Sequence, residues 1–257
     1  MKRVAVFSVP RSGSSWLGQL SNSSENVAYS FQPLFSYKFK DALNDNSDKS
    51  EVVRFFNDIC KTDDAFVRGG MGGVSFEKKE ITHSVFKEVR YLNLIEHLHR
   101  TDDELQFVFL VRNPIDVISS WVNAPKEFDT SWDINEELVE AANKNQGKPE
   151  EYYGLGKWVE ACNIFSSIED RSFIIRYEDL VKDTAQEVSN LFGFLGLEFG
   201  EQTKNFIEDS TTKHSEDPYS VFKGKRSKNT LPSSIITRIE STVSGLSEPR
   251  RGRHSDR

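Results

Sequence analysis

A short loop near the N-terminus combines residue types that bind anions. The loop is Pro10-Arg11-Ser12-Gly13-Ser14-Ser15, and it lies between an apolar run at 3–9 and a segment in which Trp16, Leu17 and Leu20 share one helical face. The free N–H groups and positive dipole end of a helix N-terminus bind phosphates. Glycine permits close backbone approach, the serines add hydroxyl donors, and the arginine adds a permanent cation. The loop therefore predicts a phosphate site; the alternative is an ordinary turn whose serines cap the helix.

This loop lacks the lysine of the common ATP- and GTP-binding motif. In G-x-x-x-x-G-K-[ST] a lysine precedes the final hydroxyl residue, whereas Gly13 precedes Ser14 here. No acidic residue at a strand end offers an obvious magnesium ligand either. The sequence therefore disfavours an ordinary ATP or GTP hydrolase, and we expect no metal site.

A second candidate anion site follows the most apolar run, QFVFLV at 106–111. Arg112 stands directly after this run, and Ser120 lies eight residues later on a helix that we expect to begin at Asn113-Pro114. Open α/β sheets bind ligands where strands end, so an arginine and a hydroxyl placed in this way could hold a second phosphate. The alternative for Arg112 is a surface ion pair with Asp116.

Apolar runs and amphipathic segments alternate along most of the chain. We expect parallel βαβ units, and hence an α/β fold with a P-loop-like central parallel sheet flanked by helices in three layers, α/β/α. The expected strands are 3–9, 27–30, 84–89, 106–111 and 172–176, and the expected helices include 51–60, 91–99, 154–168 and 184–195.

The remaining segments are polar or rich in glycine. We expect a glycine-rich loop from Arg68 to Gly73, a polar insert or lid near 125–150, and a disordered basic tail at 246–257. Residues 1–245 would then form a single domain, without internal repeats.

Composition narrows the class of protein. The chain has 257 residues with 37% hydrophobic and 28% charged residues, and its formal net charge is −7. An acidic chain is a poor general binder of nucleic acid, so any anion site must be local. The two cysteines, Cys60 and Cys162, exclude a disulfide framework, and we expect both to be buried. No signal-type segment or run of about 20 apolar residues is visible, so we expect a cytoplasmic protein without a transmembrane segment.

Taken together, these motifs resemble those of the sulfotransferase family, over residues 3 to about 229. VPRSGSSWL resembles the family's 5′-phosphosulfate loop, VFLVRNPIDVISSW its 3′-phosphate motif, and IIRYEDLVKD the strand and turn whose tyrosine contacts adenine. The resemblance implies 3′-phosphoadenosine 5′-phosphosulfate (PAPS) as sulfuryl donor and no catalytic metal. The donor-binding residues it implies are Arg11, Ser12, Gly13, Ser14, Ser15, Trp16, Arg112, Ser120 and Tyr177.

A later segment resembles the family's basic glycine loop, which covers the 3′-phosphate. It contains Lys223, Gly224 and Lys225, and the alternative is a solvated loop.

Within the family, the chain looks most like the carbohydrate branch. There a Glu-Pro-Leu motif supplies a glutamate as general base, and this sequence has Gln32-Pro33-Leu34 instead. An amide cannot take a proton, so Gln32 could only orient the acceptor. Pro33 should restrict Gln32 to extended conformations. Arg11 stands where many members of the family have lysine, and its role would be electrostatic.

The segment Lys87-Glu88-Val89-Arg90 resembles the basic segment of the same branch. Arg11, Gln32, Lys87, Glu88 and Arg90 are therefore the candidate catalytic residues. Alternation along a strand should place Lys87 and Glu88 on opposite faces, and a solvated or ion-paired role for Glu88 remains an alternative. His83 is a further candidate base.

Two other functions remain open at this point. One is a P-loop kinase that acts on a small molecule with ATP and magnesium, and the other is an inactive nucleotide-binding regulator, which Gln32 makes conceivable. For a sulfotransferase we expect a glycan or small-molecule acceptor that carries a hydroxyl or amine.

Overall fold

Five short and largely buried segments form one parallel sheet in the computed structural model, which describes residues 1–69, 74–168, 170–212 and 230–246. The strands are β1 (Lys2–Phe7), β2 (Val27–Phe31), β3 (His83–Glu88), β4 (Leu105–Val111) and β5 (Ser172–Arg176). Their order is β2-β3-β1-β4-β5 and every pairing is parallel, so all five end at one edge. The expected α/β fold is confirmed.

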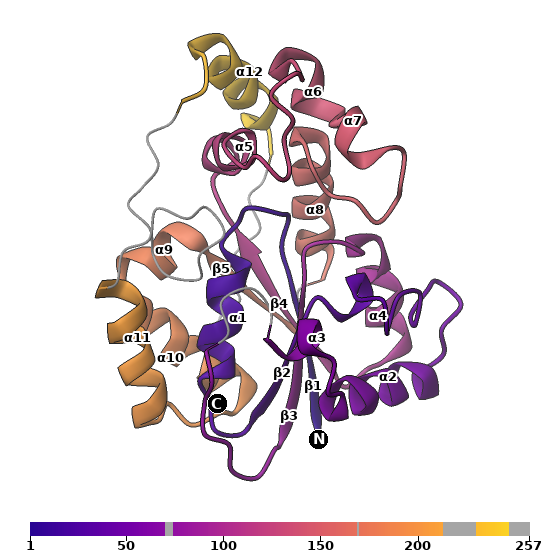
Figure 1. Ribbon diagram of the computed structural model, residues 1–257, viewed down its shortest axis with the longest axis vertical. Coiled ribbons are helices and arrows are strands. Elements are labelled where there is room, and N and C mark those ends of the chain that lie inside the picture. The colour runs from indigo at the N-terminus through magenta and orange to yellow at the C-terminus, as the bar shows by residue number, and fades with distance from the viewer. Residues whose placement is uncertain (70–73, 169, 213–229, 247–257) are drawn as a thin grey trace.

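Helices cover both faces of this sheet (Figure 1). Because side chains alternate along a strand, Phe7 of β1 packs into one core while Val6 packs into the other. The first core is covered by α2 (Lys49–Lys61), α4 (Ile95–Thr101) and α8 (Leu155–Ser167), and the second by α1 (Ser14–Asn22), α10 (Thr184–Leu195) and α11 (Glu201–Thr212).

The helices that carry a third apolar cluster lie beyond the carboxyl ends of the strands (Figure 1). The cluster joins α5 (Pro114–Val122), α6 (Ile134–Glu140) and α12 (Ser233–Val243), and a short helix α7 (Ala142–Asn145) follows α6. The polar segment 125–150 is thus partly helical, and its Phe128 and Leu138 are buried in this cluster. Its role as a lid stays a prediction.

Short elements account for several differences from expectation. Arg68 and Gly69 belong to a helix, α3 (Ala65–Gly69), because the Asp64 carboxylate accepts the Val67 N–H and caps its first turn. The rest of that expected loop, 70–73, lies outside the described residues. The turn expected after β5 is a helix, α9 (Tyr177–Lys182), and 3₁₀ turns η1 (Pro33–Phe35) and η2 (Leu92–Leu94) follow β2 and β3. Neither α11 nor α12 was predicted.

The two cysteines differ in burial. Cys162 lies in the core under α8 as expected, whereas Cys60 is partly exposed because it stands near the end of α2. Throughout the described part of the chain, no helix is both long and apolar enough to span a membrane. The expected basic tail lies outside the described residues except for Leu246.

Candidate active site

The loop between β1 and α1 has the geometry of an anion site. Arg11 has φ 69° and Gly13 has φ 92°, so the loop turns through two left-handed residues before α1 begins at Ser14. Within the described residues, no side chain caps this helix, in contrast to α2 and α5, whose first turns are capped by Asp48 and Asn113. In the described part of the chain, the serine side chains therefore do not accept hydrogen bonds from the N–H groups at the start of α1, as they would in an ordinary capped turn.

Glycine is required at Gly13 by both conformation and space. A Cβ atom there would lie 2.5 Å from the Tyr177 ring, far inside van der Waals contact. The loop therefore closes directly against the first residue of α9. This contact brings the predicted adenine-contacting tyrosine to the predicted 5′-phosphosulfate loop.

The two predicted phosphate motifs are bonded to each other through Arg11. Its carbonyl oxygen accepts a hydrogen bond of 2.9 Å from Nη1 of Arg112, and its own Nε donates to Oγ of Ser120 at 3.2 Å. The Arg112 guanidinium also lies 4.5 Å from the centre of the Tyr177 ring. Among the described residues Arg112 forms no ion pair with Asp116. It contacts Arg11 and Tyr177 instead, in contrast to the surface ion pair considered as an alternative.

Several buried polar atoms around this junction lack a protein partner. Among the described residues, neither Ser12 Oγ nor Arg112 Nε has a hydrogen-bond partner, although both are shielded from water. Buried donors without acceptors are costly, and anionic oxygens would satisfy them. Two arginines, serine hydroxyls and an open helix start therefore fit a ligand that carries two separate phosphate groups.

Gln32, at the end of β2, adopts a left-handed conformation instead of the expected extended one, with φ 40° and ψ 56°. That prediction was wrong because a local turn and one tertiary hydrogen bond together override the preference set by Pro33. The Gln32 N–H continues the sheet by donating to the Lys87 carbonyl at 2.8 Å, and its own carbonyl accepts the Phe35 N–H at 3.1 Å. A non-glycine residue in this region is strained by about 1–2 kcal/mol, and such strain gathers at functional sites.

Lys87 and Glu88 are both completely buried at the end of β3. Lys87 extends over the Phe31 ring, with Nζ 4.4 Å from the ring centre, whereas Oε1 of Glu88 accepts the Leu34 N–H at 2.8 Å. Burial lowers the pKa of Lys87 and raises the pKa of Glu88, because each charge is taken out of water. Glu88 thus stabilises η1, the turn that follows Gln32.

Arg90 lies just beyond β3 and is held from two sides. Its Nε donates to Oε2 of Glu151 at 2.9 Å, and its guanidinium lies 3.7 Å from the centre of the Phe35 ring. Its Nη1 is buried and has no hydrogen-bond partner within the described part of the chain. The guanidinium is therefore fixed in place, with the N–H groups of Nη1 left to donate to a ligand.

Two acidic residues of this region were not predicted from the sequence. Glu127 Oε1 lies 3.5 Å from Arg11 Nη1, and Glu151 pairs with Arg90. Both residues come from polar stretches with many acids, in which nothing distinguishes them by type or spacing. His83, by contrast, is buried under the opposite end of β3, where its Nε2 lies 3.0 Å from the Leu195 carbonyl. The candidates Lys223, Gly224 and Lys225 lie outside the described residues.

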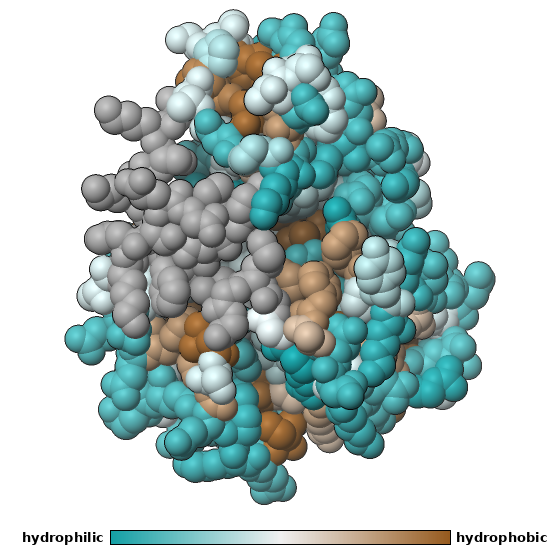
Figure 2. Space-filling view, in the orientation of Figure 1, coloured by the Kyte–Doolittle hydropathy of each residue, from teal (hydrophilic) through white to brown (hydrophobic). Residues whose placement is uncertain are grey.

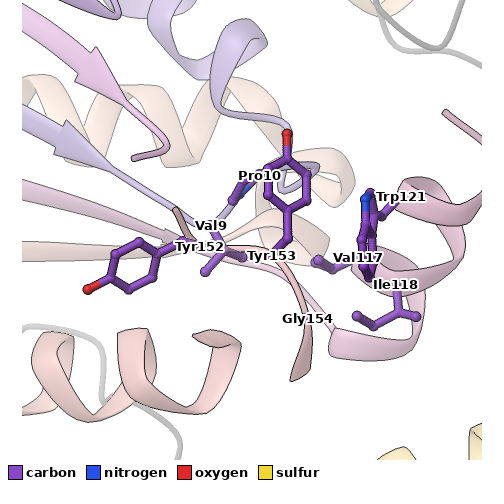
Figure 3. A pocket seen from close by; sticks show the side chains of 8 residues that line it. All are labelled: Val9, Pro10, Val117, Ile118, Trp121, Tyr152, Tyr153 and Gly154. Atoms are coloured by element: carbon purple, nitrogen blue, oxygen red, sulfur yellow. The ribbon is translucent and has the colours of Figure 1, made fainter. Parts of the chain in front are cut away.

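A small apolar cavity lies behind the loop and is not the substrate site. Figure 3 shows Val9, Pro10 and Tyr152 on one side, Trp121 of α5 on the other, and Tyr153 between them. Its volume is about 10 Å³, which is about the space that one water molecule needs. The cavity therefore belongs to the packing that supports the loop. In the described ranges no group of three or more His, Cys, Asp or Glu side chains could hold a metal ion.

Comparison with known proteins identifies the family. A model described as "Sulfotransferase domain" matches residues 1–247, so the chain belongs to the sulfotransferase domain family. It is a sulfotransferase by class. No curated protein sequence matches the chain significantly.

Solved structures support the fold. Mouse sulfotransferase SULT7A1 complexed with PAP is similar over 99% of this chain and 86% of its own, with 14% identity and a TM-score of 0.56. The sulfotransferase domain from the curacin biosynthetic pathway is similar over 94% and 96%, with 18% identity and a TM-score of 0.52. Retinol dehydratase in a complex with retinol and PAP is similar over 96% and 83%, with 16% identity and a TM-score of 0.54.

Proposed function

We propose that the protein transfers the sulfuryl group of PAPS to a hydroxyl or amine of a carbohydrate or glycoconjugate acceptor. When bound, PAPS supplies the sulfuryl group, and adenosine 3′,5′-bisphosphate is released. The observation that carries this proposal is the bonding of Arg11 to both Arg112 and Ser120, because it joins a loop suited to the 5′ side with residues suited to a 3′-phosphate. The family to which the chain belongs supports the same chemistry.

The protein's part in this reaction is to position the reactants and stabilise charge. Sulfuryl transfer resembles phosphoryl transfer, in which a loose transition state places charge on peripheral and leaving oxygens. Arg11, with its permanent charge next to the helix start, would stabilise the leaving bisphosphate, and buried Lys87 would stabilise the transferring group. Gln32 and Arg90 would orient the acceptor at the ends of β2 and β3.

Aromatic rings beside these residues support a carbohydrate acceptor. The rings of Phe35 and Phe66 are 47% and 38% exposed, and their centres lie 6.1 Å apart. The face of a sugar ring carries C–H groups that can pack on such rings, while Arg90 offers hydrogen bonds to its hydroxyls. Figure 2 shows a mostly hydrophilic surface in which some hydrophobic residues gather near the middle of the face.

The kinase alternative receives less support from the site. An ATP-dependent enzyme needs magnesium ligands and usually a lysine in the loop, and Arg11 with Ser12 provides neither. The experiment described next separates a sulfotransferase from a kinase, and both from an inactive nucleotide-binding regulator.

Ligand binding and turnover test the proposal even while the acceptor is unidentified. Adenosine 3′,5′-bisphosphate should raise the Tm more than AMP or ATP does, in the absence of magnesium. At about 100 times its Kd the ligand should stabilise the fold by about 2.7 kcal/mol. Radiolabelled PAPS and a panel of glycans, phenols and alcohols, with and without EDTA, should then reveal an acceptor. Equal Tm shifts with AMP, or transfer from ATP alone, would contradict the proposal.

A further inference from the structure

Glu127 is a carboxylate whose position is fixed by the end of α5. Its N–H donates to the Ala124 carbonyl at 2.8 Å, and its carbonyl accepts Nε1–H of the buried Trp121 at 3.1 Å. The neighbouring Phe128 ring packs edge-on against Trp121, with centres 5.1 Å apart. The backbone that carries the carboxylate is therefore anchored in the apolar cluster beyond the sheet.

The two oxygens of this carboxylate have different surroundings. Oε1 lies 3.5 Å from Nη1 of Arg11, whereas Oε2 is buried and has no hydrogen-bond partner among the described residues. The side chain as a whole is 20% exposed. A buried carboxylate oxygen without a donor is costly, and an O–H group brought by a ligand would offset that cost.

Charged and titratable groups of several elements interact electrostatically with Glu127. Arg11 of the phosphate loop forms an ion pair with it, and the carboxylate charge acts on Lys87 of β3, Lys144 of α7 and the phenol of Tyr153. The Glu127 charge acts to raise the pKa of Lys87 against the stronger effect of burial, which lowers that pKa. The carboxylate thus lies among the residues that we assign to charge stabilisation during transfer.

The other side chains of the acceptor region are poorly suited to remove a proton. Gln32 carries an amide. Glu88 also has an unpartnered oxygen, but it is fully buried and its other oxygen accepts the Leu34 N–H. Glu151 is engaged with Arg90 at 2.9 Å. Glu127 differs from these residues because its side chain as a whole is partly exposed, while its Oε2, although buried, has no donor among the described residues.

We propose that Glu127 is the general base of the sulfuryl transfer, a position in the chain that no motif indicates. The assignment rests on the proposed function. Oε2 of Glu127 accepts the proton of the acceptor hydroxyl as the acceptor oxygen bonds to sulfur. The bond between sulfur and the 5′-phosphate oxygen breaks, and its electron pair leaves with the bisphosphate, whose charge Arg11 offsets. Glu127 then returns the proton to water.

The test compares Glu127→Gln with wild type, using radiolabelled PAPS and water as the acceptor, so that release of inorganic sulfate reports turnover. Glutamine keeps the size and can still accept from Arg11, so the Tm should change little. We expect the rate to fall by about 10²–10⁴-fold. We expect the affinity for adenosine 3′,5′-bisphosphate to be retained or increased, because Arg11 loses a competing negative charge. Glu104→Gln, which alters an exposed partner of Arg3 far from these groups, is the matched control.

The dependence of the rate on pH distinguishes a general-base role of Glu127 from a role as an ion-pair partner of Arg11 only. The wild-type rate should fall as the pH is lowered and the carboxylate is protonated, and Glu127→Gln should lack this acidic limb. Glu127→Asp should retain the limb at a lower rate. Wild-type turnover in Glu127→Gln, or a lower rate with an unchanged pH profile and weaker bisphosphate binding, would overturn this assignment alone. If wild type failed to bind the bisphosphate at all, the proposed function would fall, and the assignment with it.

Discussion

Arg112→Ala tests whether this arginine binds a 3′-phosphate or only supports the loop between β1 and α1. In the structure it donates to the Arg11 carbonyl at 2.9 Å, packs at 4.5 Å on the Tyr177 ring, and leaves its buried Nε without a partner among the described residues. A charge-assisted hydrogen bond to a phosphate contributes about 1.5–3 kcal/mol, which is about 10- to 150-fold in Kd. The bond to the Arg11 carbonyl, at about 0.5–1.5 kcal/mol, supports the loop for any nucleotide.

The two contributions separate when two ligands are compared. AMP should lose only the loop-supporting part, whereas adenosine 3′,5′-bisphosphate should lose both parts. Titration calorimetry at one fixed salt concentration measures both Kd values. Arg112→Lys, which keeps the charge but loses the planar donor fork, should fall between wild type and Arg112→Ala. An equal loss of affinity for both ligands would show that Arg112 is structural and that the 3′-phosphate assignment is wrong.

Three further substitutions address other parts of the site. Gln32→Ala should slow transfer while leaving bisphosphate affinity intact, and Gln32→Glu should keep or raise the rate; unchanged turnover in Gln32→Ala would leave only a structural role. Gly13→Ala should lower both the Tm and bisphosphate affinity, because its Cβ would lie 2.5 Å from the Tyr177 ring in a left-handed conformation that costs about 1–2 kcal/mol. Thermal shift with and without ligand measures both effects, and a wild-type response would contradict the packing. Glu88→Ala should cost about 1–3 kcal/mol by leaving the buried Leu34 N–H without its acceptor, whereas Glu88→Gln should retain it. Burial raises the pKa of Glu88, so the folded state holds this proton more tightly than the unfolded chain. The stability of wild type relative to Glu88→Gln should therefore fall as the pH rises above the usual glutamate range, which denaturant titration at several pH values would detect.

Most of the central fold could be predicted from local patterns. Runs such as 106–111 and 172–176 are apolar on both sides because helices cover both faces, so they are read correctly as buried parallel strands. The same reasoning failed for α11 and α12, which contain many polar residues and form helices with only one buried side. It also failed at Arg68, where a local cap from Asp64 decided in favour of a helix.

More of the geometry around the proposed donor site could be predicted from the sequence than of the geometry around the proposed acceptor site. Arg11, Gly13, Arg112 and Ser120 stand in loops and a helix that follow apolar strands, and strand ends are where open parallel sheets bind ligands. The conformation of Gln32 could not be predicted, because hydrogen bonds to Lys87 and Phe35 outweigh the preference set by Pro33. The residue next to it in the chain indicates an intrinsic preference, but not the bond to the distant Lys87 or the turn that override this preference.

By itself, the sequence determined the kinds of chemical group available and the order of strands and helices that carry them. The periodicity of apolar residues predicts a covered parallel sheet, and the loop composition predicts an anion site. Only the tertiary structure decided which distant groups meet: Arg11 contacts Ser120, Arg112 and Glu127, each far away along the chain. The physical reason is that parallel strands bring all their carboxyl ends to one edge, while the side chains that meet there depend on how the connecting segments pack beyond that edge.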